Sequence, residues 1–152
     1  MKNITIFLDG YWRESNKQTI PFLSGIYCVY EGGYDLSKRM LQVHRLLYIG
    51  MADNIREAIE HHPDYDMWLA EVLRDRELLF SVGSVSPEEE RERALKALIY
   101  QHTPVVNMES SDGFPFSNTS LLLLGKNALL SSNFTVYRTR EPMPEKLDNL
   151  LA

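Results

Sequence analysis

The sequence predicts a single-domain α/β protein over residues 1–152, with a C-terminal β-rich extension over about residues 118–140. The chain length suits one hydrophobic core. Short β-prone apolar runs are interleaved with stretches in which apolar residues recur at helical spacing. Two last apolar runs, residues 120–124 and 134–137, are separated by a Gly-Lys-Asn turn and predict a terminal β-hairpin.

The first half of the chain carries the predicted strands. Residues 4–8 alternate as a strand does, and Asp9-Gly10 is a hairpin-type turn signal. Residues 25–30 and 45–50 are two further β-prone runs. The segment between them, residues 34–42, predicts a helical turn or an extended loop.

Helices are expected in the middle of the chain. Asp53 or Asn54 can cap a helix that ends at His62, before a proline. A second helix over residues 65–74 and a strand over residues 78–85 follow.

A third helix is expected to begin at Ser86-Pro87-Glu88-Glu89 and to run to about Gln101. Serine can cap this helix, proline suits its first turn, and Glu89 completes a capping box.

Composition limits the classes of function. The net charge of −5 and the pI near 5.4 lower the expectation of strong autonomous DNA binding, because such proteins neutralise phosphates with basic surfaces. No apolar run is long enough to span a bilayer, and the polar start is no signal peptide. The lone Cys28 cannot form an internal disulfide and is expected in the core. We therefore expect a cytoplasmic protein without a membrane partner.

Two tripeptides carry a resemblance. Gly25-Ile26-Tyr27 and Tyr48-Ile49-Gly50 each lie in a predicted strand, and a capped helix follows the second. Together with the later Leu98-Ile99, Pro104 and Asn107, this pattern resembles the GIY-YIG nuclease superfamily over roughly residues 24–107. The resemblance implies a small central antiparallel sheet flanked by helices, and hydrolysis of DNA phosphodiesters with Mg²⁺ or Mn²⁺.

Four residues match motif positions of that family. The resemblance implies that Tyr27 acts as, or assists, the general base, and that Tyr48 holds the scissile phosphate or the water network. His62 matches a frequent histidine, and Asn107 matches an asparagine that steadies the backbone or the phosphate. A structural role is an equally good interpretation: both tyrosines could be half-buried sheet residues, because a phenol of pKa near 10 is a poor base at neutral pH.

Two family residues are missing. Counting from Gly50 places Ala58 where the family has an arginine that stabilises the phosphate; Arg56 is a possible substitute. Leu95 occupies the expected position of the metal-binding glutamate, and Glu92 is a weak substitute. Without the cation, the attacking water and the leaving group lose their principal electrostatic stabilisation.

We therefore expect a degenerate GIY-YIG nuclease-like protein with weak or no metal-dependent DNA cleavage and no cofactor. Residual nucleic-acid binding would use a small basic strip of Lys38, Arg39 and Arg45, which are otherwise ordinary surface charges. One alternative is an active Mg²⁺- or Mn²⁺-dependent endonuclease with a rearranged site, in which Arg56 and Glu92 or another carboxylate take part. Another is a protein-interaction module, in which the C-terminal hairpin contacts another protein or a second copy of the chain.

Overall fold

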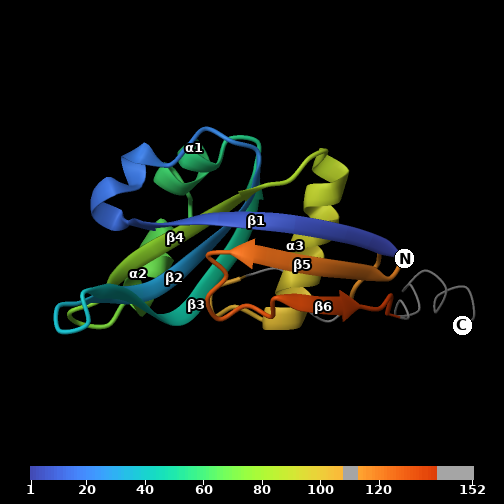
Figure 1. Ribbon diagram of the computed structural model, residues 1–152. Helices are drawn as coiled ribbons and strands as arrows, with labels where there is room; N and C mark the ends of the chain where they lie inside the picture. Colours follow the sequence, from blue (N-terminus) through green and yellow to red (C-terminus); the bar gives the residue numbers. More distant parts are fainter. Residues whose placement is uncertain (108–112, 140–152) are drawn as a thin grey trace, which may run out of the picture.

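The computed structural model describes residues 1–107 and 113–139, so residue 140 of the predicted extension lies outside the described residues. The chain forms an α/β fold with one curled sheet (Figure 1). The strands are β1 (Lys2–Arg13), β2 (Gly25–Asp35), β3 (Met40–Ala52), β4 (Glu77–Ser84), β5 (Thr119–Gly125) and β6 (Asn133–Val136). The helices are the 3₁₀-helix η1 (Glu14–Thr19), α1 (Ile55–Glu60), α2 (Tyr65–Glu71) and α3 (Glu88–His102).

The sheet has the strand order β3-β2-β4-β1-β5-β6. The prediction of an antiparallel sheet is wrong for the whole, because β1 pairs antiparallel with β4 but parallel with β5. The terminal hairpin is confirmed: β5 pairs antiparallel with β6. It extends the same sheet beyond β1, so the first strand of the chain lies beside β5, the first strand of the terminal hairpin (Figure 1).

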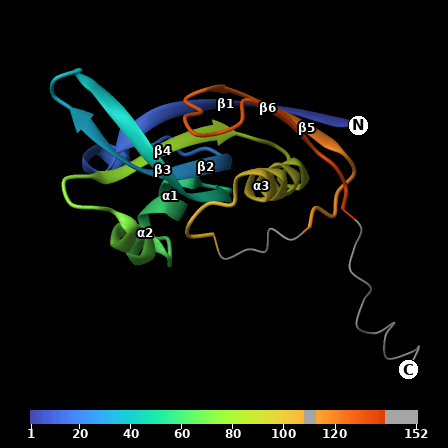
Figure 2. The same cartoon turned by 90° about the horizontal axis from the view of Figure 1, so that it is seen from below.

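The sheet buries side chains on both faces. One apolar cluster joins Cys28 and Ile49 to α3, which lies in the hollow of the curl (Figure 2). The other cluster joins Tyr27 and Tyr48 to α1 and α2 on the opposite face. Cys28 is confirmed as a core residue, and burial raises its pKa to about 12, so its thiol stays protonated at neutral pH.

Two predicted breaks in the strands are wrong. Asp9-Gly10 does not reverse the chain: β1 continues, and its register with β4 shifts between Gly10 and Trp12. Gly10 has φ +143°, and a Cβ there would lie 2.8 Å from the Phe80 carbonyl oxygen, so this glycine permits a bulge rather than a turn. Residues 34–42, predicted as a helical turn or an extended loop, are mostly strand: β2 and β3 extend into one long hairpin that leaves only residues 36–39 as a turn.

The helix boundaries agree with the predictions in part. The Asn54 side chain accepts a hydrogen bond from the Glu57 N–H and caps α1, as predicted. α2 ends at Glu71, three residues before the predicted end. The prediction of a capping box at the start of α3 is wrong, because Pro87 takes the N-cap position and its side chain makes no capping hydrogen bond.

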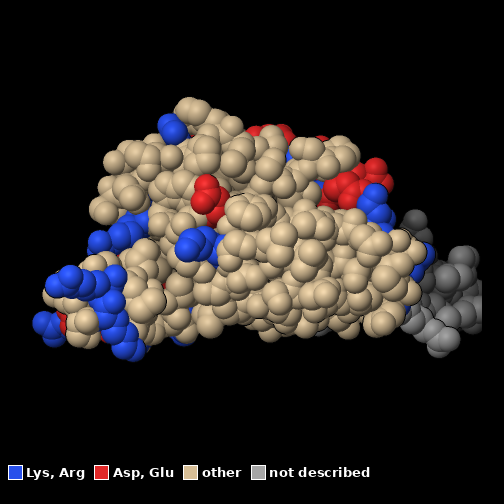
Figure 3. Space-filling view, in the orientation of Figure 1, with Lys and Arg blue, Asp and Glu red and all other residues tan. Residues whose placement is uncertain are grey.

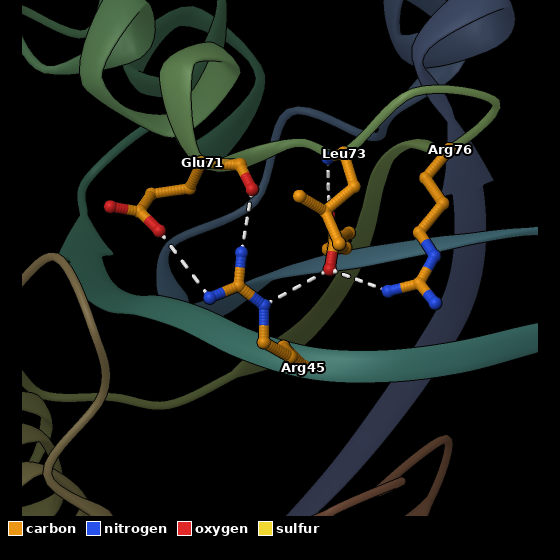
Figure 4. A network of polar contacts seen from close by, with 5 residues as sticks. Arg45, Glu71, Leu73 and Arg76 are labelled. Carbon is orange, nitrogen blue, oxygen red and sulfur yellow. Dashed lines mark hydrogen bonds and ion pairs between the residues drawn. The ribbon is translucent and has the colours of Figure 1, made fainter.

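A buried carboxylate connects three segments of the chain. Glu31 in β2 is fully buried and accepts hydrogen bonds from two guanidinium groups and one backbone N–H (Figure 4). The donors are Arg45 Nε in β3 at 3.0 Å, Arg76 Nη1 at 3.1 Å and the Leu73 N–H at 2.6 Å. Arg45 also donates to the Glu71 carbonyl oxygen at 2.6 Å, so this network ties the connection between α2 and β4 to the long hairpin.

The protonation of Glu31 couples this network to pH. Burial alone would raise its pKa, but the hydrogen bonds from Leu73, Arg45 and Arg76 outweigh it and hold the pKa below the usual value. The carboxylate therefore stabilises the fold at neutral pH.

The variant Glu31→Gln should lower the free energy of unfolding at pH 7 by about 2 kcal/mol, because two guanidinium groups lose their shared anion. The contribution is complete above the unfolded pKa of about 4.3 and is lost as the pH falls through the lower folded pKa. Urea unfolding at neutral and acidic pH should show that the difference in free energy of unfolding between wild type and variant becomes smaller in acid. The exposed Glu60→Gln is the control; an equal loss there at pH 7 would contradict the role of Glu31.

Candidate functional site

An open pocket of about 480 Å³ lies where β2 and β3 meet α1. It brings together the two motif tyrosines and the motif histidine. Its polar lining consists of Tyr27, Tyr48, Asp53, Asn54, Glu57, His61 and His62.

The two glycines of the motif make room for close contacts. Tyr27 lies opposite Gly50 in the pairing of β2 with β3. A Cβ at Gly50 would lie 2.4 Å from both Cζ and Oη of Tyr27, so a larger residue would displace that ring. A Cβ at Gly25 would lie 1.9 Å from the Gly83 carbonyl oxygen in β4. The glycines of both tripeptides are therefore explained by packing.

The motif tyrosines are core residues with one end at the pocket. Tyr27 and Tyr48 are both buried, and their ring centroids are 6.0 Å apart. Trp68 of α2 lies against Tyr48, with 5.2 Å between ring centroids. The Tyr48 ring thus packs α2 against the sheet, and both tyrosines are more deeply buried than the half-buried sheet residues that were predicted.

His62 contacts Tyr48 directly. The His62 Nε2 and the Tyr48 hydroxyl oxygen are 3.3 Å apart, and the Asp64 N–H donates to His62 Nδ1 at 2.9 Å. Because Nδ1 accepts, the neutral imidazole carries its proton on Nε2 and donates toward Tyr48. The imidazole also lies 4.5 Å from the Trp68 ring, centroid to centroid. In this tautomer His62 does not take a proton from Tyr48.

Asn107 holds the edge of the sheet. Its amide oxygen accepts from the Ile49 N–H at 3.0 Å, and its amide nitrogen donates to the Ile49 carbonyl oxygen at 2.9 Å. The Val106 N–H also donates to the Leu47 carbonyl oxygen at 2.7 Å. Asn107 therefore steadies the backbone of the second tripeptide, in the manner of a neighbouring strand.

The charged groups that cleavage would require are elsewhere. Ala58 lines the pocket, whereas the Arg56 guanidinium lies 3.8 Å from the Phe22 ring and hydrogen-bonds to the Ile20 carbonyl oxygen. Leu95 is buried in the cluster on the other face of the sheet, and Glu92 is exposed on α3. Neither proposed substitute, Arg56 nor Glu92, lines the pocket.

Three charged residues at this site were not predicted. Asp53 and Glu57 line the pocket, and Arg91 of α3 donates to Asp53 Oδ1 at 2.8 Å and to the Ala52 carbonyl oxygen at 2.9 Å. A sequence signal for Arg91 exists: it precedes Leu95 by four residues and Leu98 by seven, on the buried face of the helix.

The predicted basic strip is divided. Arg45 is held by Glu31 and Glu71 in the network described above. Lys38 and Arg39 lie exposed in the turn between β2 and β3. Lys and Arg atoms gather over this end of the molecule (Figure 3).

Metal binding finds no support in the side-chain arrangement. Across the described ranges, no three His, Cys, Asp or Glu side chains are grouped so that they could hold a metal ion.

Among the helices of residues 1–107 and 113–139, none has the length and apolar character needed to cross a membrane. A scan against protein-family models, a search of curated proteins and a search of solved structures each found no match.

The fit between Tyr27 and Gly50 can be tested with a matched pair of glycines. Gly50→Ala should lower the free energy of unfolding by about 1–3 kcal/mol and change the near-UV circular dichroism, because the buried Tyr27 ring must move. Gly33→Ala, whose Cβ would find its nearest atom at 3.6 Å, should stay within about 0.5 kcal/mol of wild type. Equal effects of the two substitutions in urea unfolding would contradict the close contact.

Proposed function

We propose that the chain is a GIY-YIG nuclease-like protein that has lost efficient metal-dependent DNA cleavage and keeps weak nucleic-acid binding. The observation that carries this proposal is the charge at the motif pocket. Its ionisable lining includes the carboxylates of Asp53 and Glu57, and among the described residues no Lys or Arg lines it.

The resemblance to this family is supported by the order of the elements around the pocket. The hairpin of β2 and β3 carries the two tripeptides, α1 and α2 follow, and β4 returns beside β2 before α3. Tyr27, Tyr48 and His62 meet in one pocket, and Asn107 hydrogen-bonds to the middle residue of the second tripeptide.

Loss of cleavage follows from electrostatics. A phosphodiester is an anion, and carboxylates without a bound cation repel it. The Arg91 guanidinium is occupied, because it donates to Asp53 and to the Ala52 carbonyl oxygen. Arg56 is directed to Phe22, away from the pocket lining. The position counted for the metal ligand, Leu95, is apolar and buried.

A second candidate function is an active nuclease with a rearranged site. The observation that favours it is the arrangement of Asp53, Glu57 and Arg91, because carboxylates and a guanidinium are present near the motif tyrosines. Their positions are exchanged relative to the family: here a carboxylate, Glu57, lies on α1 and a guanidinium, Arg91, lies on α3. The two candidates differ in whether Glu57 is needed for cutting.

Plasmid nicking in Mg²⁺ or Mn²⁺ separates them. The wild-type protein should produce no metal-dependent nicking above background, and Tyr27→Phe and Glu57→Gln should not differ from it. Calorimetric titration with Mn²⁺ should show no binding, since no oxygen-rich ligand group is assembled.

The contrary result has a specific signature. Nicking by the wild-type protein that disappears in Glu57→Gln but persists in Glu60→Gln would establish the rearranged nuclease. Glu60 is exposed on the same helix and does not line the pocket. It therefore controls for the loss of a negative charge on α1.

Residual nucleic-acid binding is assigned to the tip of the long hairpin rather than to the pocket. Lys38 and Arg39 are exposed there, and Arg74 and Arg76 line a small depression beside this turn. Asp35 and Asp75 also lie at this depression and reduce its positive charge. Binding there should therefore be weak and strongly dependent on salt.

The double variant Lys38→Gln/Arg39→Gln should weaken retention of duplex DNA several-fold at low salt and reduce the slope of log affinity against log salt by about two. Fluorescence anisotropy of a labelled duplex over a range of salt concentrations measures both quantities. Lys126→Gln, in the turn between β5 and β6, is the control and should leave them unchanged. Equal weakening by the control would contradict an interface at the hairpin tip.

A further inference from the structure

The outward face of β1, β5 and β6 lacks a covering layer. Side chains alternate along these strands, with Ile4, Ile6 and Leu8 buried toward α3 and their neighbours exposed on the outside. The cluster beneath α1 and α2 takes in β2, β3 and β4, and of β1 it reaches only Trp12, near the far end of that strand. Three large apolar side chains are left exposed: Phe7 at 67%, Leu124 at 43% and Leu122 at 38%.

These apolar side chains form one continuous patch. Phe7 lies opposite Leu124 in the parallel pairing of β1 with β5, and Leu122 is the next outward residue along β5. Toward the start of β1 and β5 the outward neighbours are uncharged: Thr5 is paired with Leu122, and Ser120 shares a 2.7 Å hydrogen bond with Thr135. At the other end, the exposed Asp9 and Lys126 follow Phe7 and Leu124 by two residues and bound the patch. We call Phe7, Leu122, Leu124 and these neutral neighbours the bare face.

Charge distinguishes the bare face from the rest of the surface. In the space-filling view, the right-hand part of the area over β1, β5 and β6 is free of Lys, Arg, Asp and Glu atoms, which lie toward the left-hand ends of β1 and β5 and at the right-hand margin (Figure 3). The whole chain carries a net charge of −5, so an uncharged region of this size is unexpected on a solvated face.

We propose that the bare face binds a second copy of this chain, with the two sheets packed face to face. In a two-fold contact each residue near the axis meets its own copy, so a charge there would face the same charge. A surface with apolar and hydroxyl side chains and no central charge satisfies that condition. A second copy also brings a sheet of identical twist, which aligned sheet packing requires.

The size of the bare face sets the strength of the contact. Seven residue pairs join β1 to β5. At about 3.3 Å per residue and about 4.8 Å between strands, the three strands span roughly 23 Å by 14 Å. Two such faces bury less than the roughly 1,200 Å² typical of stable interfaces. The dimer is therefore weak and forms at micromolar or higher concentrations.

Sedimentation velocity of the full chain tests the proposal. From about 5 to about 500 µM, the weight-average mass should rise from the 17.6 kDa monomer toward twice that value. Leu122→Lys and Leu124→Lys should each hold the mass at the monomer value, because the lysines would face their own copies. Both positions are already partly exposed, so circular dichroism and thermal unfolding should stay close to wild type.

Leu36→Lys is the matched control. Leu36 is 83% exposed in the turn between β2 and β3, away from the bare face, so this variant should dimerise as the wild type does. A wild-type mass of one chain at every concentration would overturn the proposal and leave another protein or residues 140–152 as the occupant. Dimerisation that survives both Leu122→Lys and Leu124→Lys would also overturn it.

Discussion

The pairing of β2 with β3 is the constraint on which the motif pocket depends. Three contacts hold this pairing. Tyr27 fills the space at Gly50, and Glu31 binds Arg45 across the strands. Asn107, from the segment after α3, bonds to the outer edge of β3 at Ile49. Each contact acts at a different height along the hairpin. Together they fix the register, and a shift by one residue would turn the motif tyrosines to the opposite face.

The same contacts explain how motif residues can persist without chemistry. Tyr27 and Tyr48 fill the core beneath α1 and α2, and Asn107 replaces the strand that is missing at the edge of β3. These residues stabilise the fold whether or not a substrate binds. A catalytic arginine or glutamate has no comparable packing role, so Ala58 and Leu95 are compatible with an intact fold. The retained and missing parts of the motif thus differ in their physical function.

Local patterns predicted the elements better than their pairing. The strands of the motif, the Asn54 cap, the third helix and the terminal hairpin were all predicted, because turn residues and apolar periodicity act over a few positions. The parallel pairing of β1 with β5 was not, since it joins segments more than a hundred residues apart. Asp9-Gly10 was wrongly predicted to form a turn, because a glycine with positive φ is found in β-bulges as well as in turns. Arg91 was missed because it lies in a run of charges that resembles a solvated helix face.

The burial of Arg91 is not explained by a gain in the stability of the fold. It is almost entirely buried, and within the described part of the chain its Nε has no hydrogen-bond partner. Its acidic partner Asp53 is 86% exposed, so the pair gains little from a low-dielectric surrounding. A buried guanidinium with an unsatisfied N–H costs free energy that a leucine at this position would not. Its location beside the motif pocket is therefore the strongest structural reason to test Glu57 and Asp53 for chemistry of their own.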